Sequence, residues 1–351
     1  MFVHPAPRTR PRVAGAVLLP ALGVALAVSM VISVGVGPVF IPPETVVGVV
    51  AAKLGMLADP GTWTAAESNI VWLLRLPRVI AGTFVGAALS VAGAAIQALV
   101  RNPLADPYLL GISSGASAGA ATQILFVASA AGATALAGSA FLGALLAIVL
   151  VFALARIGGR LVPSRLVFAG IAVGFALGAL TNLLVFLSNS RDGVRAVLFW
   201  MLGSLGQSRW DTLGLLCLST LVTFVLLLGW SRRLDAIALG DDTARALGTH
   251  PIRFRALATG TVALGVAVAV SVSGAIGFVG LVVPHVARRL VGAPHRLVLP
   301  ASALIGGLVL IWSDALARTA FAPAELPLGV LTALLGTPLL IALVHRMSAV
   351  L

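Results

Sequence analysis

Long stretches without a charged residue recur along this chain of 351 residues. A helix needs about 20 apolar residues to cross the hydrocarbon core of a bilayer, and many of these stretches reach that length. They predict membrane-spanning helices at 14–37, 79–100, 166–187, 212–230, 257–275, 297–314 and 327–345.

Two further regions add three helices to this set. Asp106 and Arg156 enclose 49 residues without a charge, which would be about 74 Å long as one helix. They therefore predict two helices with a turn near 128–139. The segment 277–290, GFVGLVVPHVARRL, is short and contains Pro284, but the distribution of charge requires a crossing there. We expect an all-α polytopic membrane protein with about ten transmembrane helices.

Composition supports this class, because the chain is 60% hydrophobic and only 10% charged. A water-soluble domain of this size would need a more polar surface, and a membrane barrel would show alternating apolar positions in short strands. The first apolar run is longer than that of a signal peptide and lacks a clear cleavage site, so we expect a retained helix. The expected organisation is a tail at 1–13, one transmembrane domain at 14–346 and a tail at 347–351.

Basic residues indicate the orientation. If the N-terminus is cytoplasmic, sixteen of the 23 basic residues lie on inner segments and seven on outer ones. The cytoplasmic loops of membrane proteins carry an excess of Lys and Arg. We therefore expect a multi-pass membrane protein with both termini in the cytoplasm.

Two predicted helices carry faces of small residues at helical spacing. The first face consists of Gly82, Gly86, Ser90, Gly93 and Gln97. The second consists of Gly170, Gly174, Gly178 and Asn182. Small residues let helices approach closely, so these faces indicate either tight helix packing or a smooth wall of a translocation pathway.

Ionisable groups are missing from the middle of every predicted span, and Asp314 lies near an end. Ion-coupled carriers usually place such groups within the membrane, so the driving force is expected to come from a partner. The inner segment 231–255 is a candidate contact surface for this partner, because apolar residues are interspersed with charged ones. These apolar residues are Leu234, Ile237, Ala238, Ala244 and Leu247. Partner docking and a helix on the membrane surface both fit this pattern.

No catalytic or metal-binding group is expected. Cys217 is the single cysteine and can form neither an intramolecular disulfide nor a cysteine cluster. His285 lies alone near a predicted inner boundary, where a structural role is more common. A phosphate-binding G-x-x-x-x-G-K-[ST] loop is absent from the sequence, so we expect no ATP hydrolysis by the chain itself, and no cofactor.

Several long motifs resemble permeases of the iron-siderophore, haem and vitamin B12 importer family (FecCD-type), the transmembrane subunits of type II ABC importers. They are LRLPR (74–78), GAALSVAGAAIQALVRNPLADPYLLGISSGA (86–116), ALGDDTARALG (238–248), GFVGLVVPHVARRL (277–290) and AELPLGVLTALLGTPLLIALV (324–344). One departure is Pro163, where relatives often carry a hydroxyl residue. The resemblance implies a homodimer with the pathway between the copies, two cytoplasmic ATP-binding subunits and an extracytoplasmic substrate-binding protein, in membrane lipid and without nucleic acid.

The resemblance also implies roles for individual residues. Arg75, Arg78 and Arg318 match an outer pocket that receives carboxylates of the binding protein. Such a role requires residues that lie on the outer side and are unpaired within the protein before docking, although pairing with Glu67 or Asp314 is possible. Anchoring at the membrane interface is the other interpretation. The inner gate turns correspond to Asn102, Leu104 and Ser164. The ATPase contact corresponds to Leu239, Gly240, Ala244, Leu247 and Gly248.

The function expected from these features is import of iron chelates (ferric siderophores) by a permease subunit powered by a separate ATPase. Haem or vitamin B12 (cobalamin) is the alternative cargo within the same architecture. Functions of a different class are an ion-coupled secondary transporter and a membrane-embedded enzyme, and the lack of buried His, Cys or acid clusters argues against the enzyme.

Overall fold

The computed structural model describes residues 13–56, 58, 61–127, 132–157, 160–161 and 163–348. Over these residues the chain is helical except for connecting segments and a small antiparallel hairpin of β1 (Arg156–Ile157) and β2 (Arg160–Leu161). The longer helices are α1 (Val13–Gly35), α4 (Leu76–Val100), α5 (Ile112–Phe126), α6 (Gly132–Ala155), α7 (Pro163–Leu187), α9 (Trp210–Gly229), α12 (Pro251–Ser273), α13 (Val279–Val291), α14 (His295–Thr319) and α15 (Leu328–Ser348). The shorter ones are α2 (Pro43–Lys53), α3 (Ala65–Asn69), the π-helical η1 (Ile70–Arg75), the 3₁₀ turn η2 (Pro107–Leu110), α8 (Arg191–Met201), α10 (Ser231–Leu239) and α11 (Asp241–Ala246).

All ten expected spans are helices in the structure, and the predicted fold class is confirmed. In the described part of the chain, seven helices are long and apolar enough to cross a membrane: α1, α4 with the preceding α3 and η1, α6, α7, α9, α12 and α14. The other three are α5, α13 and α15. Helix α13 has only 13 residues and contains Pro284, as expected for the short segment 277–290.

Two helices, α2 and α8, were not predicted from the sequence. Each has 11 residues and carries charged residues, so neither resembles an uncharged run of spanning length. The other difference concerns α4, which continues α3 and η1 without a break, so that one helical rod runs from Ala65 to Val100.

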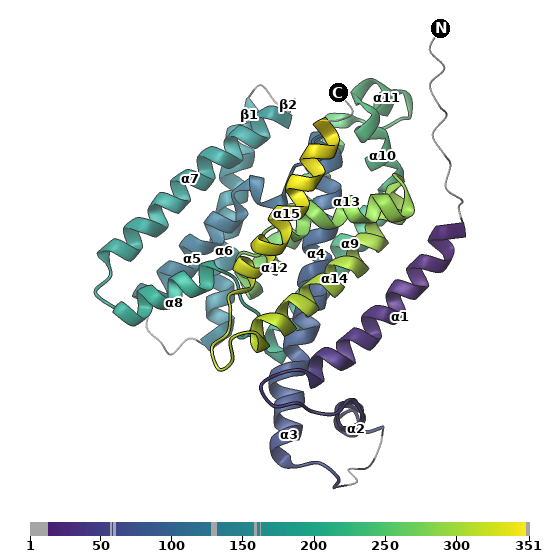
Figure 1. Ribbon diagram of the computed structural model, residues 1–351. Coiled ribbons are helices and arrows are strands. Elements are labelled where there is room, and N and C mark those ends of the chain that lie inside the picture. Colours follow the sequence, from purple (N-terminus) through teal and green to yellow (C-terminus); the bar gives the residue numbers. More distant parts are fainter. Residues whose placement is uncertain are drawn as a thin grey trace.

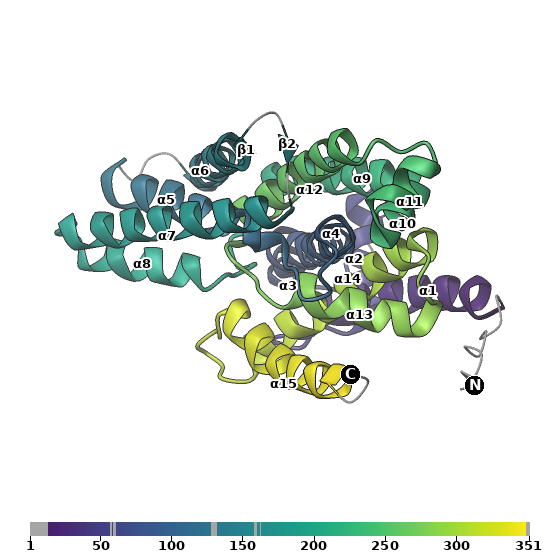
Figure 2. The ribbon, with the colours of Figure 1, turned by 90° about the horizontal axis from the view of Figure 1, so that it is seen from above.

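Helix α4 forms the centre of the molecule and packs against α14, α12, α13 and α9 (Figures 1 and 2). Most of its residues are buried, and many of them are Ala, Gly or Ser. A second group of helices, α5 to α8, lies beside this bundle, with α5 packed against both α6 and α7. The small side chains of α4 allow close contact with several neighbours at once.

The functional residues lie at two opposite ends of the helix bundle (Figure 1). Helices α2 and α3 lie at one end, which we call the α3 end. Helices α10 and α11 lie at the other, together with the β1–β2 hairpin, and we call this the α11 end. The charge distribution of the sequence predicts that the α11 end is cytoplasmic.

Candidate functional site

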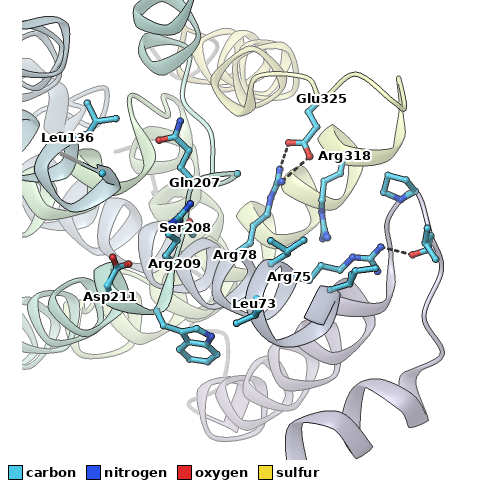
Figure 3. Close-up of a pocket in the computed structure, with 17 residues that line it drawn as sticks. Leu73, Arg75, Arg78, Leu136, Gln207, Ser208, Arg209, Asp211, Arg318 and Glu325 are labelled. Atoms are coloured by element: carbon cyan, nitrogen blue, oxygen red, sulfur yellow. Dashed lines mark hydrogen bonds and ion pairs between the residues drawn. The ribbon is translucent and has the colours of Figure 1, made fainter. Parts of the chain in front are cut away.

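A cavity of about 1070 Å³ lies at the α3 end (Figure 3). Its walls come from the loop after α1, from η1 and α4, from the loop that precedes α9, and from α14 and the loop that follows it. The lining includes Arg75, Arg78, Arg209, Arg318 and Glu325. Four guanidinium groups therefore lie around one cavity that is large enough to admit side chains of another protein.

Arg78 is fully engaged by two carboxylates. Its Nε donates to Asp314 of α14 at 2.9 Å, and its two terminal nitrogens donate to the two oxygens of Glu325 at 3.0 and 2.9 Å (Figure 3). Asp314 is 1% exposed, whereas the Glu325 side chain is 42% exposed. A bidentate contact of this kind is among the stronger interactions of a guanidinium. Of the two carboxylates, Glu325 lies on the cavity side and is the one that solvent can reach.

Arg75 binds backbone carbonyls at the end of α1. Its terminal nitrogens donate to Val34 at 3.0 Å, to Gly35 at 2.9 Å and to Val39 at 2.5 Å. The last carbonyls of a helix lack partners within the helix and carry the negative end of its dipole. Arg75 therefore fixes the end of α1 against the rod formed by η1 and α4.

Arg318 has a similar structural role. It donates to the backbone carbonyls of Ser33 and Val36, each at 3.0 Å, and to the hydroxyl of Ser33 at 2.9 Å. Its Nε lies 3.2 Å from Asp314, and the residue is 4% exposed. Two of the three arginines thus hold α1 in place.

The expectation that these arginines are unpaired before docking is wrong. Arg75, Arg78 and Arg318 are all buried and have partners within the chain. Asp314 is one of the partners, as the sequence allowed, whereas Glu67 instead completes a capping box with Thr64. The physical reason is that burying a guanidinium without partners is costly.

The exposed cation of this cavity is Arg209, which the sequence analysis did not single out. It precedes α9, is exposed, and its side chain has no hydrogen bond or ion pair to the described part of the chain. The neighbouring Trp210 stacks on Trp72 at 4.8 Å between ring centroids and donates to its carbonyl at 2.8 Å. This pair fixes the backbone beside Arg209 and leaves the guanidinium free.

The first small-residue face is a packing face within the chain. A Cβ at Gly86 would lie 2.2 Å from the carbonyl oxygen of Gly306, and one at Gly93 would lie 1.8 Å from that of Gly280. Gly82 lies against Leu205. Backbone contact this close leaves no room for a cargo, so the alternative of a pathway wall on this face is wrong.

The polar members of that face are also buried. Ser90 is 0% exposed, and Gln97 is 3% exposed. Gln97 donates to the carbonyl of Leu281 at 3.1 Å and accepts from Arg288 at 2.8 Å. The amide therefore ties α4 to α13.

The second small-residue face is only half covered. Gly170 packs against the carbonyl of Leu109, but a Cβ at Gly178 would meet nothing within 4 Å, and Asn182 is exposed. Beside this face is a second cavity of about 540 Å³, lined by η2, α7, the start of α13 and α15. Helix α7 thus presents an open face next to a cavity.

Residues 231–255 form α10, α11 and the start of α12. Leu234, Ile237 and Ala244 are buried within the chain, so most of the apolar set packs inward. Leu239 and Leu247 are 74% and 66% exposed and lie on either side of α11 at the tip of the α11 end. These two leucines are the large apolar side chains that this segment exposes to a partner.

The proposed gate residues are also accessible at the α11 end. Asn102, Leu104 and Ser164 are exposed. The side chain of Asn102 accepts a hydrogen bond from the backbone N–H of Leu104 at 2.9 Å, which fixes the turn that follows α4. Among the described residues, no group of three or more His, Cys, Asp or Glu could hold a metal ion.

The sequence analysis also missed a charged cluster beneath α11. Asp241 lies 2.7 Å from Arg255, and Asp235 lies 2.6 Å from His295. The hydrogen bonds from Arg255 hold the pKa of Asp241 below its usual value. At Asp235, burial acts to raise the pKa, but the contacts with His295 lower it below its usual value overall. The sequence shows the acidic residues of this segment, but it does not show that Arg255 and His295 pair with them.

Comparison with known proteins gives the identity of this architecture. Residues 25–346 match the FecCD transport family. The chain is 42% identical to the hemin transport system permease protein HmuU of Yersinia pestis, over 81% of this chain and 86% of HmuU. It is 40% identical to the vitamin B12 import system permease protein BtuC of Vibrio cholerae, over 83% of this chain and 87% of BtuC.

A solved structure agrees with the sequence relatives. It shows an inward-facing conformation of a protein assigned as a metal-chelate type ABC transporter, and the two chains superpose with a TM-score of 0.80 at 31% identity. The match covers 94% of this chain and 99% of the other. This chain belongs to the FecCD transport family and is a membrane-spanning permease of the ABC importer type.

Proposed function

We propose that the chain imports metal chelates across the bacterial inner membrane as a homodimer, with ferric siderophores as the cargo. Haem and vitamin B12 are the alternative cargoes, because HmuU and BtuC are named as hemin and vitamin B12 permeases. One observation carries the proposal: a cation-lined cavity lies at one end of the bundle and an exposed apolar tip lies at the other. An importer powered by a separate ATPase needs one docking surface on each side of the membrane.

The α11 end is the proposed contact for two ATP-binding subunits. Leu239 and Leu247 supply exposed apolar area there, and Ala244 anchors α11 to the chain between them. Gly240 and Gly248 have φ values of 127° and 75°, a region that favours glycine, so both ends of α11 turn sharply. Asn102, Leu104 and Ser164 would form the inner gate beside this contact.

The pathway is proposed to run between two copies of the chain. Within one copy the face of α4 is closed by packing, whereas α7 is open beside the cavity of about 540 Å³. Phe175 is 77% exposed on the same helix. A second copy placed against α7 and α15 would enclose this cavity and complete the wall.

The α3 end is proposed to receive the substrate-binding protein. Arg209 is free to bind a carboxylate of that partner, and arginine suits this contact because of its planar set of donors. Arg78 can take part only by exchanging the exposed Glu325 for a partner carboxylate. Arg75 and Arg318 act indirectly, because they fix the end of α1 at the rim of the cavity.

Uptake in cells tests the cargo. The chain, its ATPase and its binding protein would be expressed in a strain that lacks its own permeases, and uptake of a ferric siderophore, hemin and cobalamin would be measured. We expect ATP-dependent uptake of the ferric siderophore. Uptake of only hemin or only cobalamin would identify that compound as the cargo instead of the ferric siderophore. Uptake that needs an ion gradient but no ATPase would overturn the importer proposal.

A further inference from the structure

Arg255 connects three parts of the chain at the α11 end. It lies in the first turns of α12, and its side chain is 7% exposed. Its two terminal nitrogens donate to the two oxygens of Asp241 at 2.9 and 2.7 Å, while Nε donates to the backbone carbonyl of Leu99 at 2.9 Å. One guanidinium therefore bridges α11 and the last turn of α4.

The carbonyl of Leu99 lies directly before the proposed gate turn. Helix α4 ends at Val100, its cap residue Arg101 has a left-handed φ of 52°, and Asn102 then begins the turn. Arg101 also lies 3.6 Å from Asp241. The carboxylate of Asp241 is thus close to two cations, one on α12 and one at the end of α4.

Few other contacts hold α11 against the rest of the chain. The helix has six residues, and Ala244 is its one buried residue. The flanking glycines at 240 and 248 place sharp turns at both ends. A displacement applied at Leu247 would reach the helix bundle through Asp241 and Ala244, whereas Leu239 belongs to α10, which packs on α4 and α14 directly.

We propose that Asp241 is a positioning residue that joins the ATPase-contacting helix α11 to the gate turn after α4, through the guanidinium of Arg255. This inference rests on the proposed function, because it assigns a mechanical role to the contact between α11 and the ATPase. Asp241 touches neither cargo nor nucleotide. It holds Arg255, and Arg255 holds the carbonyl three residues before Asn102.

The chain contains a matched control for this role. Asp242 lies next in the same helix and carries the same charge, but its side chain is fully exposed and pairs only with Arg245, three residues along. Replacing Asp242 with Asn removes one charge from α11 and leaves the bridge to α4 intact. A general effect of charge on the ATPase contact would appear in both variants.

The first test measures cargo transported per ATP hydrolysed by the complete complex in proteoliposomes. For Asp241→Asn we expect normal assembly and ATP hydrolysis, with transport per ATP lowered about tenfold, as expected for loss of a hydrogen-bonded buried charge contact. Arg255→Lys should behave alike, because a lysine cannot make the planar set of contacts. Asp241→Glu should recover part of the loss, and Asp242→Asn should lower transport per ATP much less than Asp241→Asn does. Equal ratios in Asp241→Asn and Asp242→Asn, or failure of Asp241→Asn and Arg255→Lys to assemble, would overturn the inference.

The second test does not depend on the ATPase or the cargo. In a Cys217→Ser background, spin labels on cysteines placed at Leu104 and Leu247 report the distance between the gate turn and the tip in detergent. We expect a narrow distribution in the unmodified pair and in Asp242→Asn, and a clearly broader one in Asp241→Asn. An equally narrow distribution in Asp241→Asn would contradict the bridge, whereas failure of the proposed function would leave this result unchanged.

Discussion

Buried and exposed arginines have different roles at the α3 end. Arg75 and Arg318 donate hydrogen bonds to the last carbonyls of α1, and Arg78 is paired with Asp314 and Glu325. Reversal of any of these charges would disrupt the fold as well as docking. Arg209 separates the two effects, because its guanidinium has no partner among the described residues.

We therefore predict that Arg209→Glu weakens docking of the binding protein without changing the thermal stability of the permease. Replacing attraction with repulsion acts mainly on the association rate and its salt dependence. We expect an affinity loss of about tenfold at low salt that shrinks as salt screens the charges. Binding to the detergent-solubilised complex measures it, and Arg195→Glu, an exposed position on α8, is the matched control. Equal affinity in both variants would argue against this role for Arg209.

Asp106 gives a prediction that depends on pH. Its side chain accepts from the N–H of Tyr108 at 2.8 Å at the start of η2, and burial raises its pKa to about 6. The usual value is about 3.9, so the folded protein binds this proton more tightly than the unfolded chain. The resulting stabilisation is complete below about pH 4 and is lost as the pH rises through about 6.

Asp106→Asn keeps the shape and the acceptor but removes the ionisation. We therefore expect the variant to have a higher Tm than the unmodified protein at about pH 8, with a much smaller difference at about pH 5. Thermal unfolding in detergent at the two pH values measures both differences. The same difference at both pH values would show that the carboxyl does not titrate in this range.

At the scale of helices, the glycines of α4 and α7 provide matched positions. A Cβ at Gly93 would lie 1.8 Å from the carbonyl oxygen of Gly280, whereas one at Gly178 would meet nothing within 4 Å. We predict that Gly93→Ala destabilises the protein by about 1–3 kcal/mol, the usual cost of overpacking. Gly178→Ala should be neutral or slightly stabilising in a single chain, since Ala favours helix more than Gly. Thermal unfolding tests both, and an undisturbed Gly93→Ala variant would contradict the packing of α4 on α13.

The sequence could predict the spanning helices but only part of their environment. The uncharged runs locate the membrane-spanning helices, because the thickness of the bilayer sets the length of such a helix. The spacing of Gly86 and Gly93 correctly indicates a close-packed helix face. The same spacing could not show whether α14 or a cargo covers that face. The sequence also could not show which acids pair with Arg78, because Asp314 lies 236 residues away along the chain. Charged short helices such as α8 lack the uncharged length that the prediction uses.

At the scale of the whole molecule, the two ends must act together. The cavity at the α3 end and the tip at the α11 end are connected through α4, which starts beside Arg78 and ends at the proposed gate turn. In the proposed function, a separate ATPase supplies energy at the α11 end, and α4 connects that end to the cavity at the α3 end. The proposed assembly has two copies of the chain and two ATP-binding subunits.

Transport by the purified chain in liposomes, with and without its ATPase partner, tests this assembly most directly. We expect a 2:2 complex that accumulates a metal chelate only when ATP is supplied on the side of the α11 end, and we expect no accumulation by the chain alone under a proton or sodium gradient. Accumulation by the chain alone under such a gradient, without the ATPase, would contradict the proposed function and identify a secondary transporter instead.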